Sequence, residues 1–283
     1  MVGAGHLHRG LVGLRPAGDE EGAVEIACKV WRLRVVARDI GGGRAFLASV
    51  LDVGGKKPSR ARSLALYGDS LFAFHLGKIQ ESRERSQAAL DVAVAVDGRE
   101  ALTLAYLALS RVAFADGEYA QSVSLAVKAR EFGSNLDPAM GQAPLFLHAL
   151  AARMTGDYDQ AADLFRQSVD LNRKLGDQGM VRAELLNLGL VEIHRGNVDI
   201  AEKCFAESEK LGRANDPYGI AMANLRHALI AFARGNTGGS RALLQRAQSM
   251  LKEAKVDPVP DDQFEIDRLH GELEKNARDL RPT

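Results

Sequence analysis

The sequence is poor in several features that define whole classes of protein. Its 283 residues include only two cysteines, Cys28 and Cys204, and 6% aromatic residues. Two cysteines cannot build the disulfide framework of a small secreted domain, so they favour a reducing compartment. The net charge is zero, with 37 basic and 37 acidic residues. We therefore expect no direct binding of nucleic acid through overall positive charge.

Long apolar segments and sorting signals are also missing. No apolar run approaches the roughly 18 residues that a membrane span needs, so no membrane association is expected. Residues 1–14 lack the charged start, the continuous apolar stretch and the cleavage site of a secretory signal. These features together predict a cytoplasmic protein.

Glycine and aspartate recur with a period of about forty residues. One series is Gly77, Gly117, Gly156, Gly196 and Gly235, with spacings of 40, 39, 40 and 39. The other is Asp97, Asp137, Asp177, Asp216 and Asp257, with spacings of 40, 40, 39 and 41. Glycine suits the left-handed residue that ends a helix, and aspartate suits the N-cap that begins one. Each repeat is thus predicted to be helix, glycine turn, helix and aspartate-capped turn.

Small residues recur at three fixed distances from each glycine. They stand seven residues before it, five after it and twelve after it. The three sets are Ser70, Ser110, Ala149, Gly189 and Ala228; Ser82, Ser122, Ala161, Ala201 and Ser240; and Ala89, Ala129, Ser168, Ser208 and Ala247. Small side chains on both helices let the backbones approach closely, which predicts an all-α array of stacked helix pairs.

Segments such as GDYDQAADLF (156–165) and LNLGLVEIHRGNVDIAEKCF (186–205) resemble the tetratricopeptide repeat. The common form has a period of roughly 34 residues, so the longer period here implies longer helices. The longer form resembles the C-terminal repeat arrays of large bacterial LuxR-type and antibiotic-regulator ATPases. The resemblance implies a right-handed α-solenoid and a regulatory, partner-binding role without catalysis or a cofactor.

The repeat pattern also predicts how the chain is divided. We expect a flexible head at 1–22, an array at 23–256 and a C-terminal capping helix within 257–283. Within the array, a degenerate first unit covers 23–60, with Trp31 over its open end, and five clear units cover 61–256. Residues 26–66 carry nine bases against two acids, and residues 257–283 carry eight acids against four bases. The bases at 56–62 suit a solvated loop. A docking patch for an acidic partner, or self-association of the two oppositely charged ends, stays open.

The signals for chemistry are weak. Gly68-Asp69-Ser70-Leu71 and Asp267-x-x-His270 resemble the two blocks of GDSL esterases, but Ser70 also occupies a small repeat position, which explains it without catalysis. His6 and His8 lack a third metal ligand nearby, and no phosphate-binding loop is evident. His148 and His227 are expected to pack between helices, and Cys204 is expected to be an inert core thiol. We therefore predict no catalytic residue, metal or cofactor.

In tetratricopeptide arrays the first helix of each unit lines a concave groove. By that resemblance, the groove is expected to present a mixed apolar and basic surface to a protein or peptide partner. The candidate residues are Phe74, Arg111, Phe114, Arg153, Asn187, His194, Arg226 and Phe232.

Asn187 and Arg226 stand at equivalent positions, as in the subfamily that grips C-terminal carboxylates. Phe146, Leu150 and Met222 replace the companion polar residues of that subfamily, which argues against such a clamp. The leading interpretation is a partner-binding arm of a bacterial transcriptional or signalling regulator. The alternatives are a receptor for a peptide or small inducer in the groove and, more remotely, the esterase.

Overall fold

The computed structural model describes residues 22, 24–27, 39–53, 57–212 and 217–279, and these residues contain helices and turns but no strand. The predicted all-α class is therefore confirmed for the part of the chain that is described. The described residues divide into two compact units, which meet in the sequence between Leu147 and His148. Most of the predicted flexible head, together with Cys28, Trp31 and Asp216, lies outside the described residues.

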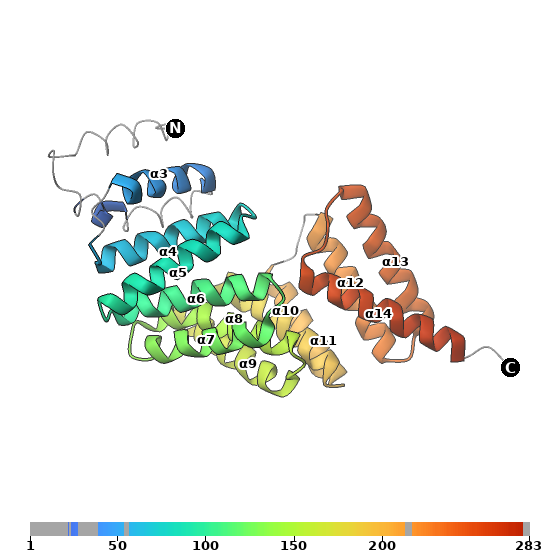
Figure 1. Cartoon of the computed structure of the whole chain (residues 1–283). Helices are drawn as coiled ribbons and strands as arrows, with labels where there is room; N and C mark the ends of the chain where they lie inside the picture. The colour runs from blue at the N-terminus through green and yellow to red at the C-terminus, as the bar shows by residue number, and fades with distance from the viewer. Residues whose placement is uncertain (1–21, 23, 28–38, 54–56, 213–216, 280–283) are drawn as a thin grey trace. The chain divides into compact units, whose positions relative to one another are not determined.

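Each unit is built from consecutive antiparallel helices (Figure 1). Unit 1 contains α3 (Ile40–Val53), α4 (Arg60–His75), α5 (Ile79–Ala95), α6 (Arg99–Ala115), α7 (Tyr119–Gly133) and the short 3₁₀ helix η1 (Pro138–Gly141). Unit 2 contains α9 (Tyr158–Leu175), α10 (Gln178–His194), α11 (Val198–Leu211), α12 (Pro217–Ala233), α13 (Thr237–Ala254) and α14 (Pro260–Asp279). Helix α8 (Gln142–Met154) carries the division between the units.

The glycine turns lie where the sequence predicts them. The five repeat glycines have φ angles of 71°, 76°, 82°, 77° and 78°, a left-handed conformation that glycine adopts without a steric penalty. The N–H of the residue after the glycine then reaches the carbonyl five positions back. Lys78 donates to Ala73 at 2.9 Å, and Asn197 donates to Glu192 at 2.8 Å. This hydrogen bond closes the first helix of each pair.

The aspartate series has the predicted capping role only in part. The side chains of Asp137 and Asp177 accept hydrogen bonds from backbone N–H groups two and three residues later, at 2.9 and 3.0 Å. Asp97 instead has a φ of 48° and turns the chain with its own backbone, which a short polar residue tolerates. Asp257 also does not begin a helix, because α14 starts at Pro260. The N-cap prediction is wrong at these two positions.

The small repeat positions form the helix contacts, and all fifteen are buried. Ser82 donates its hydroxyl hydrogen to the carbonyl of Ser70 at 2.9 Å. Ser110 and Ser122 donate to each other's carbonyls at 2.8 and 2.9 Å. Serine thus gives a helix pair two benefits, because it is small and it also satisfies a carbonyl on the facing helix.

Gly189 shows how close this packing is. A Cβ atom added to it would lie 2.7 Å from Cδ1 and 2.8 Å from Cζ of Phe205. The ring of Phe205 on α11 therefore fills the space that a side chain on α10 would need. Glycine is required here by the neighbouring ring, whereas the glycines of the turns are required by backbone conformation.

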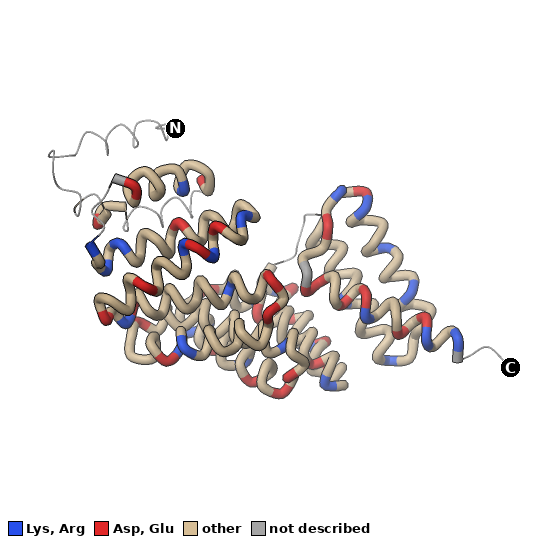
Figure 2. The backbone as a smooth tube through the Cα atoms, in the orientation of Figure 1, with Lys and Arg blue, Asp and Glu red and all other residues tan. Residues whose placement is uncertain are grey.

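A hydrophobic core runs through α10 to α14 of unit 2. Helix α14 contributes Ile266, Leu269 and Leu273, which are 4%, 0% and 1% exposed. It packs against α12 and α13 with this apolar face and carries charged residues elsewhere (Figure 2). That this helix caps the repeat array stays a prediction.

Candidate functional site

Four of the residues predicted to line the groove stand three positions before a repeat glycine: Phe74, Phe114, Arg153 and Phe232. In unit 1, Phe74 and Phe114 are half-buried. The guanidinium carbon of Arg111 lies 5.8 Å from the ring centroid of Phe74. This distance allows a cation–π contact, so the fold brings two predicted residues together in one patch.

In unit 2, Arg153 is 1% exposed and joins two helices to α14. Its Nη1 donates to Oδ1 of Asn187 at 2.9 Å, and its Nη2 lies 3.2 Å from Oδ2 of Asp261. The amide of Asn187 in turn donates to the carbonyl of Ala183 at 3.1 Å. The two predicted residues are therefore in contact, and the charged partner of Arg153 is an acid of the C-terminal helix.

His194 makes a second contact with an acid of α14. Its Nε2 is 2.8 Å from Oε1 of Glu265, and the two side chains are 5% and 1% exposed. The ring of Tyr158 stacks on the imidazole, with centroids 4.3 Å apart and an interplanar angle of 8°. The histidine is thus held between an aromatic face and a carboxylate.

The electrostatics of Glu265 reflect its partners. Burial alone would raise the pKa of its carboxyl. The hydrogen bond and charge of His194, with the charges of Arg153 and Arg268, outweigh burial and hold this pKa below its ordinary value. Glu265 is therefore ionised at neutral pH, in spite of its low exposure.

Tyr218 on α12 makes a third contact with α14, which the sequence analysis did not anticipate. Its hydroxyl donates to Oδ2 of Asp262 at 2.5 Å and accepts the N–H of Val259 at 3.2 Å. Burial raises the pKa of Asp262, with the hydrogen bond from Tyr218 acting in the opposite direction. Three acids of α14 thus meet residues from three different helices.

The remaining predicted residues of unit 2 are Arg226 and Phe232. The guanidinium carbon of Arg226 lies 5.9 Å from the ring centroid of Phe205, and Phe232 packs against the core of unit 2. Burial lowers the pKa of Arg226, while the charge of Asp262 raises it. Arg226 and Asn187 do not form a shared clamp, because both polar atoms of the Asn187 amide already have partners inside the unit.

Arg226 also lines a pocket of about 350 Å³ in unit 2. Arg182, His227 and Ser208 stand on other parts of its wall. Arg182 donates its Nε–H to the carbonyl of Gly212 at 2.6 Å. His227 is exposed, so its prediction as a packing histidine is wrong, whereas the same prediction is confirmed for the buried His148.

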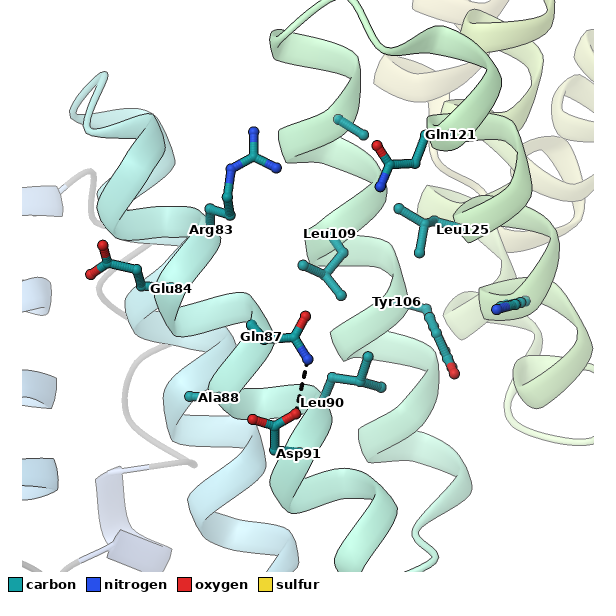
Figure 3. A pocket seen from close by; sticks show the side chains of 12 residues that line it. Arg83, Glu84, Gln87, Ala88, Leu90, Asp91, Tyr106, Leu109, Gln121 and Leu125 are labelled. Carbon is teal, nitrogen blue, oxygen red and sulfur yellow. Dashed lines mark hydrogen bonds between the residues drawn. The ribbon is translucent and has the colours of Figure 1, made fainter.

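Unit 1 has a larger groove, of about 690 Å³, along α5, α6 and α7 (Figure 3). Leu109 and Leu125 supply apolar surface, and Gln87 donates to Asp91 at 2.8 Å on its wall. The ammonium of Lys128 lies 5.4 Å from the ring centroid of Tyr106. The groove is therefore mixed in character, and no predicted site residue lies in it.

The structure does not support the esterase interpretation of Ser70. Ser70 lies within α4, is 1% exposed and donates its hydroxyl hydrogen to the carbonyl of Tyr67 at 2.7 Å. A nucleophilic hydroxyl must be accessible to substrate and must contact a base. The Ser70 hydroxyl is buried, and it donates its hydrogen bond to a backbone carbonyl. His270 is exposed on α14 and lies 3.6 Å from Glu274. Cys204 is buried, and burial raises the pKa of its thiol to about 11, so it is the inert core thiol that we expected.

Membrane-spanning helices and metal-binding clusters are both absent from the described residues. None of the described helices combines the length and the apolar character that crossing a membrane requires. No set of three or more His, Cys, Asp or Glu among the described residues is arranged to hold a metal ion.

The residues that sequence reasoning missed are Tyr158, which stacks on His194, Tyr218, and the three acids of α14, Asp261, Asp262 and Glu265. The signal that could have found the acids is their spacing, since Asp261 and Glu265 stand one helical turn apart. Self-association through the charged ends stays a prediction. Two of the acids it would use, Asp261 and Glu265, are already paired within unit 2.

Comparisons with known proteins bear on the fold. No protein-family model matches the chain, and no curated protein matches it. PilF from Pseudomonas aeruginosa is similar in structure, with a TM-score of 0.59 at 13% identity over 89% of this chain and 99% of PilF. A tetratricopeptide repeat protein from Parabacteroides merdae has a TM-score of 0.52 at 13% identity, over 90% of this chain and 86% of that protein.

TPR-like repeats of a kinesin light chain from Podosopora anserina give a TM-score of 0.54 at 15% identity, over 66% of this chain and 93% of the repeats. Together, these likenesses show that the chain has the fold of TPR-like α-solenoid proteins. The predicted fold class is thereby confirmed. The resemblance to regulator arrays is not tested by these structures.

Proposed function

We propose that the chain is a non-enzymatic interaction module that binds a protein or peptide partner. The observation that carries this proposal is the contact of Arg153 with Asp261 of α14. Arg153 stands three residues before a repeat glycine, and it contacts α14. The equivalent residues of unit 1, Phe74 and Phe114, are only half-buried. By repeat equivalence they present the corresponding face for a partner.

The chemistry of this face suits protein recognition. Aromatic residues and arginine contribute most of the binding energy in many interfaces, because they bury a large area and lose little entropy per contact. Phe74 with Arg111 stacked over it is such a combination. A partner segment that offers apolar side chains beside a carboxylate would match it.

The finer role follows from the resemblance to bacterial regulators. We propose that the module is the partner-binding arm of a cytoplasmic transcriptional or signalling regulator, acting through another protein and not through direct contact with nucleic acid. The balanced charge of the chain supports this role, because nucleic-acid binding depends strongly on basic surface.

The proposal is tested by affinity capture of a partner, followed by titration calorimetry that measures its affinity for this chain. Phe74→Ala/Arg111→Ala should weaken binding of the identified partner at least tenfold, which is a loss of about 1.4 kcal/mol or more. The control variant Lys128→Ala removes one positive charge from α7, in the groove of Figure 3, and should leave the affinity unchanged. Equal affinities for the two variants, with unchanged circular dichroism, would overturn the assignment of this face.

A second candidate function is favoured by the pocket between Arg182 and Arg226. Its wall carries two guanidinium groups and an imidazole against the single carboxylate of Glu209, and Arg226 donates no hydrogen bond among the described residues. Such a pocket suits the carboxylate or phosphate of a small inducer. Binding would raise the melting temperature by mass action, and Arg226→Ala should abolish that rise. Melting curves that stay unchanged across phosphate and small dicarboxylates would exclude this candidate.

A further inference from the structure

Helix α14 has two chemically different parts. Its first turns carry Asp261, Asp262 and Glu265, and red residues dominate this end of the helix in Figure 2. Its middle carries the apolar residues Ile266, Leu269 and Leu273, which belong to the core of unit 2. The apolar residues are sufficient to explain α14 as a capping helix, but they do not explain the acids.

Each of the three acids has its own partner, and each partner comes from a different helix. Asp261 lies 3.2 Å from Arg153 of α8, Glu265 lies 2.8 Å from His194 of α10, and Asp262 accepts a 2.5 Å hydrogen bond from Tyr218 of α12. We name Arg153, His194 and Tyr218, with Asn187 and Tyr158 beside them, the acid-binding surface. Its donors project from the first helices of three consecutive repeats.

The fit between α14 and the acid-binding surface is incomplete. The Nε atom of Arg153 is buried and has no hydrogen-bond acceptor among the residues that the structure describes, although a guanidinium group offers five donors. A buried donor without a partner carries a desolvation penalty. A ligand with a better-placed carboxylate could satisfy this donor. Arg153 can therefore donate one more hydrogen bond than α14 accepts.

The chain that precedes the acids is also weakly anchored. Residues 256–259 are not helical, and Val256 and Val259 are 41% and 47% exposed. Phe264, between the acids, is 38% exposed. Unwinding of the first turns of α14 would release all three acids, while Leu269 and Leu273 stay in the core.

We propose that the acid-binding surface is the docking site for an acidic amphipathic helix of a partner protein, and that the start of α14 is its resident competitor. The partner helix would carry two adjacent carboxylates and a third one turn later, as in Asp261, Asp262 and Glu265. Charge complementarity selects this occupant, because the surface already holds three carboxylates through guanidinium, imidazole and hydroxyl donors. This inference rests on the proposed function and names its partner class.

A resident competitor lowers the apparent affinity for the partner. The dissociation constant is divided by the fraction of molecules in which the surface is open. Any change that weakens the hold of α14 should therefore tighten binding of an external acidic helix. The size of that gain reports how often the surface is open in the wild-type chain.

The test uses full-length chains and a fluorescein-labelled synthetic peptide with the sequence of residues 257–279. The variant Asp261→Asn/Glu265→Gln weakens the competitor without touching the surface. The control Asp267→Asn/Glu272→Gln removes the same charge from exposed positions of α14. In fluorescence anisotropy, the first variant should bind the peptide at least about tenfold more tightly than wild type and control. Adding Arg153→Gln to it should abolish the gain.

Two results would overturn the proposal: equal peptide affinity for all three chains, or a gain that survives Arg153→Gln. Hydrogen exchange on the wild-type chain gives an independent reading, since excess peptide should speed exchange of the amides at 261–266. Unchanged exchange at saturating peptide would also overturn the proposal. Sedimentation of the first variant shows whether α14 of a second copy takes the site, which would replace the partner protein as occupant. If only this inference fails, Phe74→Ala/Arg111→Ala still weakens partner binding.

Discussion

Glu184 is a buried carboxyl between α9 and α10, and its replacement by glutamine should change how stability depends on pH. The side chain is 0% exposed, and Ser168 donates its hydroxyl hydrogen to Oε1 at 2.7 Å. The other oxygen, Oε2, has no hydrogen-bond partner within the described part of the chain. Burial raises the pKa of this carboxyl from 4.5 to about 7, although the hydrogen bond from Ser168 opposes the change.

The direction of the effect follows from proton binding. Between pH 4.5 and 7 the folded chain holds the proton of Glu184 and the unfolded chain has lost it. The stability from the neutral carboxyl is therefore fully present below pH 4.5 and is lost as pH rises through about 7. Over the whole interval the loss is about 3 kcal/mol, at 1.36 kcal/mol per pH unit.

Glu184→Gln removes this titration, and urea unfolding at pH 5 and pH 8 measures the result. The variant should become more stable relative to wild type by about 2–3 kcal/mol between those pH values. Glu272→Gln, on an exposed stretch of α14, is the control and should show no such change. A difference in unfolding free energy between Glu184→Gln and wild type that is the same at both pH values would show that Glu184 does not titrate in this interval.

Three further predictions concern the turns, the helix contacts and α14. In thermal melts, Gly117→Ala should destabilise the folded chain by about 1 kcal/mol, because Gly117 has a φ of 76°. Gly271→Ala, inside α14, should instead stabilise the folded chain by up to about 1 kcal/mol. Equal effects of the two variants would contradict the turn assignment. Ala161→Leu should cost about 1–3 kcal/mol, because the site is 0% exposed, and an unchanged melting curve would count against the helix pairing. The pKa of Glu265 is lowered in the folded chain, so its contribution to stability is present above pH 4.5 and is lost as the pH falls through the pKa of the folded state. In circular dichroism titrations, Glu265→Gln should therefore reduce the loss of stability at acid pH.

The repeat architecture could be predicted because it depends on local rules. A glycine turn needs one residue with positive φ, and a close helix contact needs small side chains at fixed positions. The turn role of Gly196 and the helix-contact role of Ala201 can therefore be predicted without knowledge of the rest of the chain. The same logic fails at Asp97, because aspartate suits two different turn positions and the sequence does not distinguish them.

Of the contacts in the candidate site, only the residues on the first helices could be predicted, and not the acids that they contact. Arg153, Asn187 and His194 could be placed on first helices from their distance to the repeat glycines. Their partners Asp261 and Glu265 lie 108 and 71 residues away from Arg153 and His194 in the sequence. Contacts over such separations depend on the tertiary path of the chain, which periodicity does not describe.

Hydroxyl-radical footprinting of the full-length chain, with and without its captured partner, locates the binding face. We expect Phe74 and Phe114 to lose reactivity in the complex, because the face three residues before each glycine turn is the binding face. Tyr106, in the other groove of unit 1, should keep its reactivity. Protection of Tyr106 with no change at Phe74 and Phe114 would contradict the account.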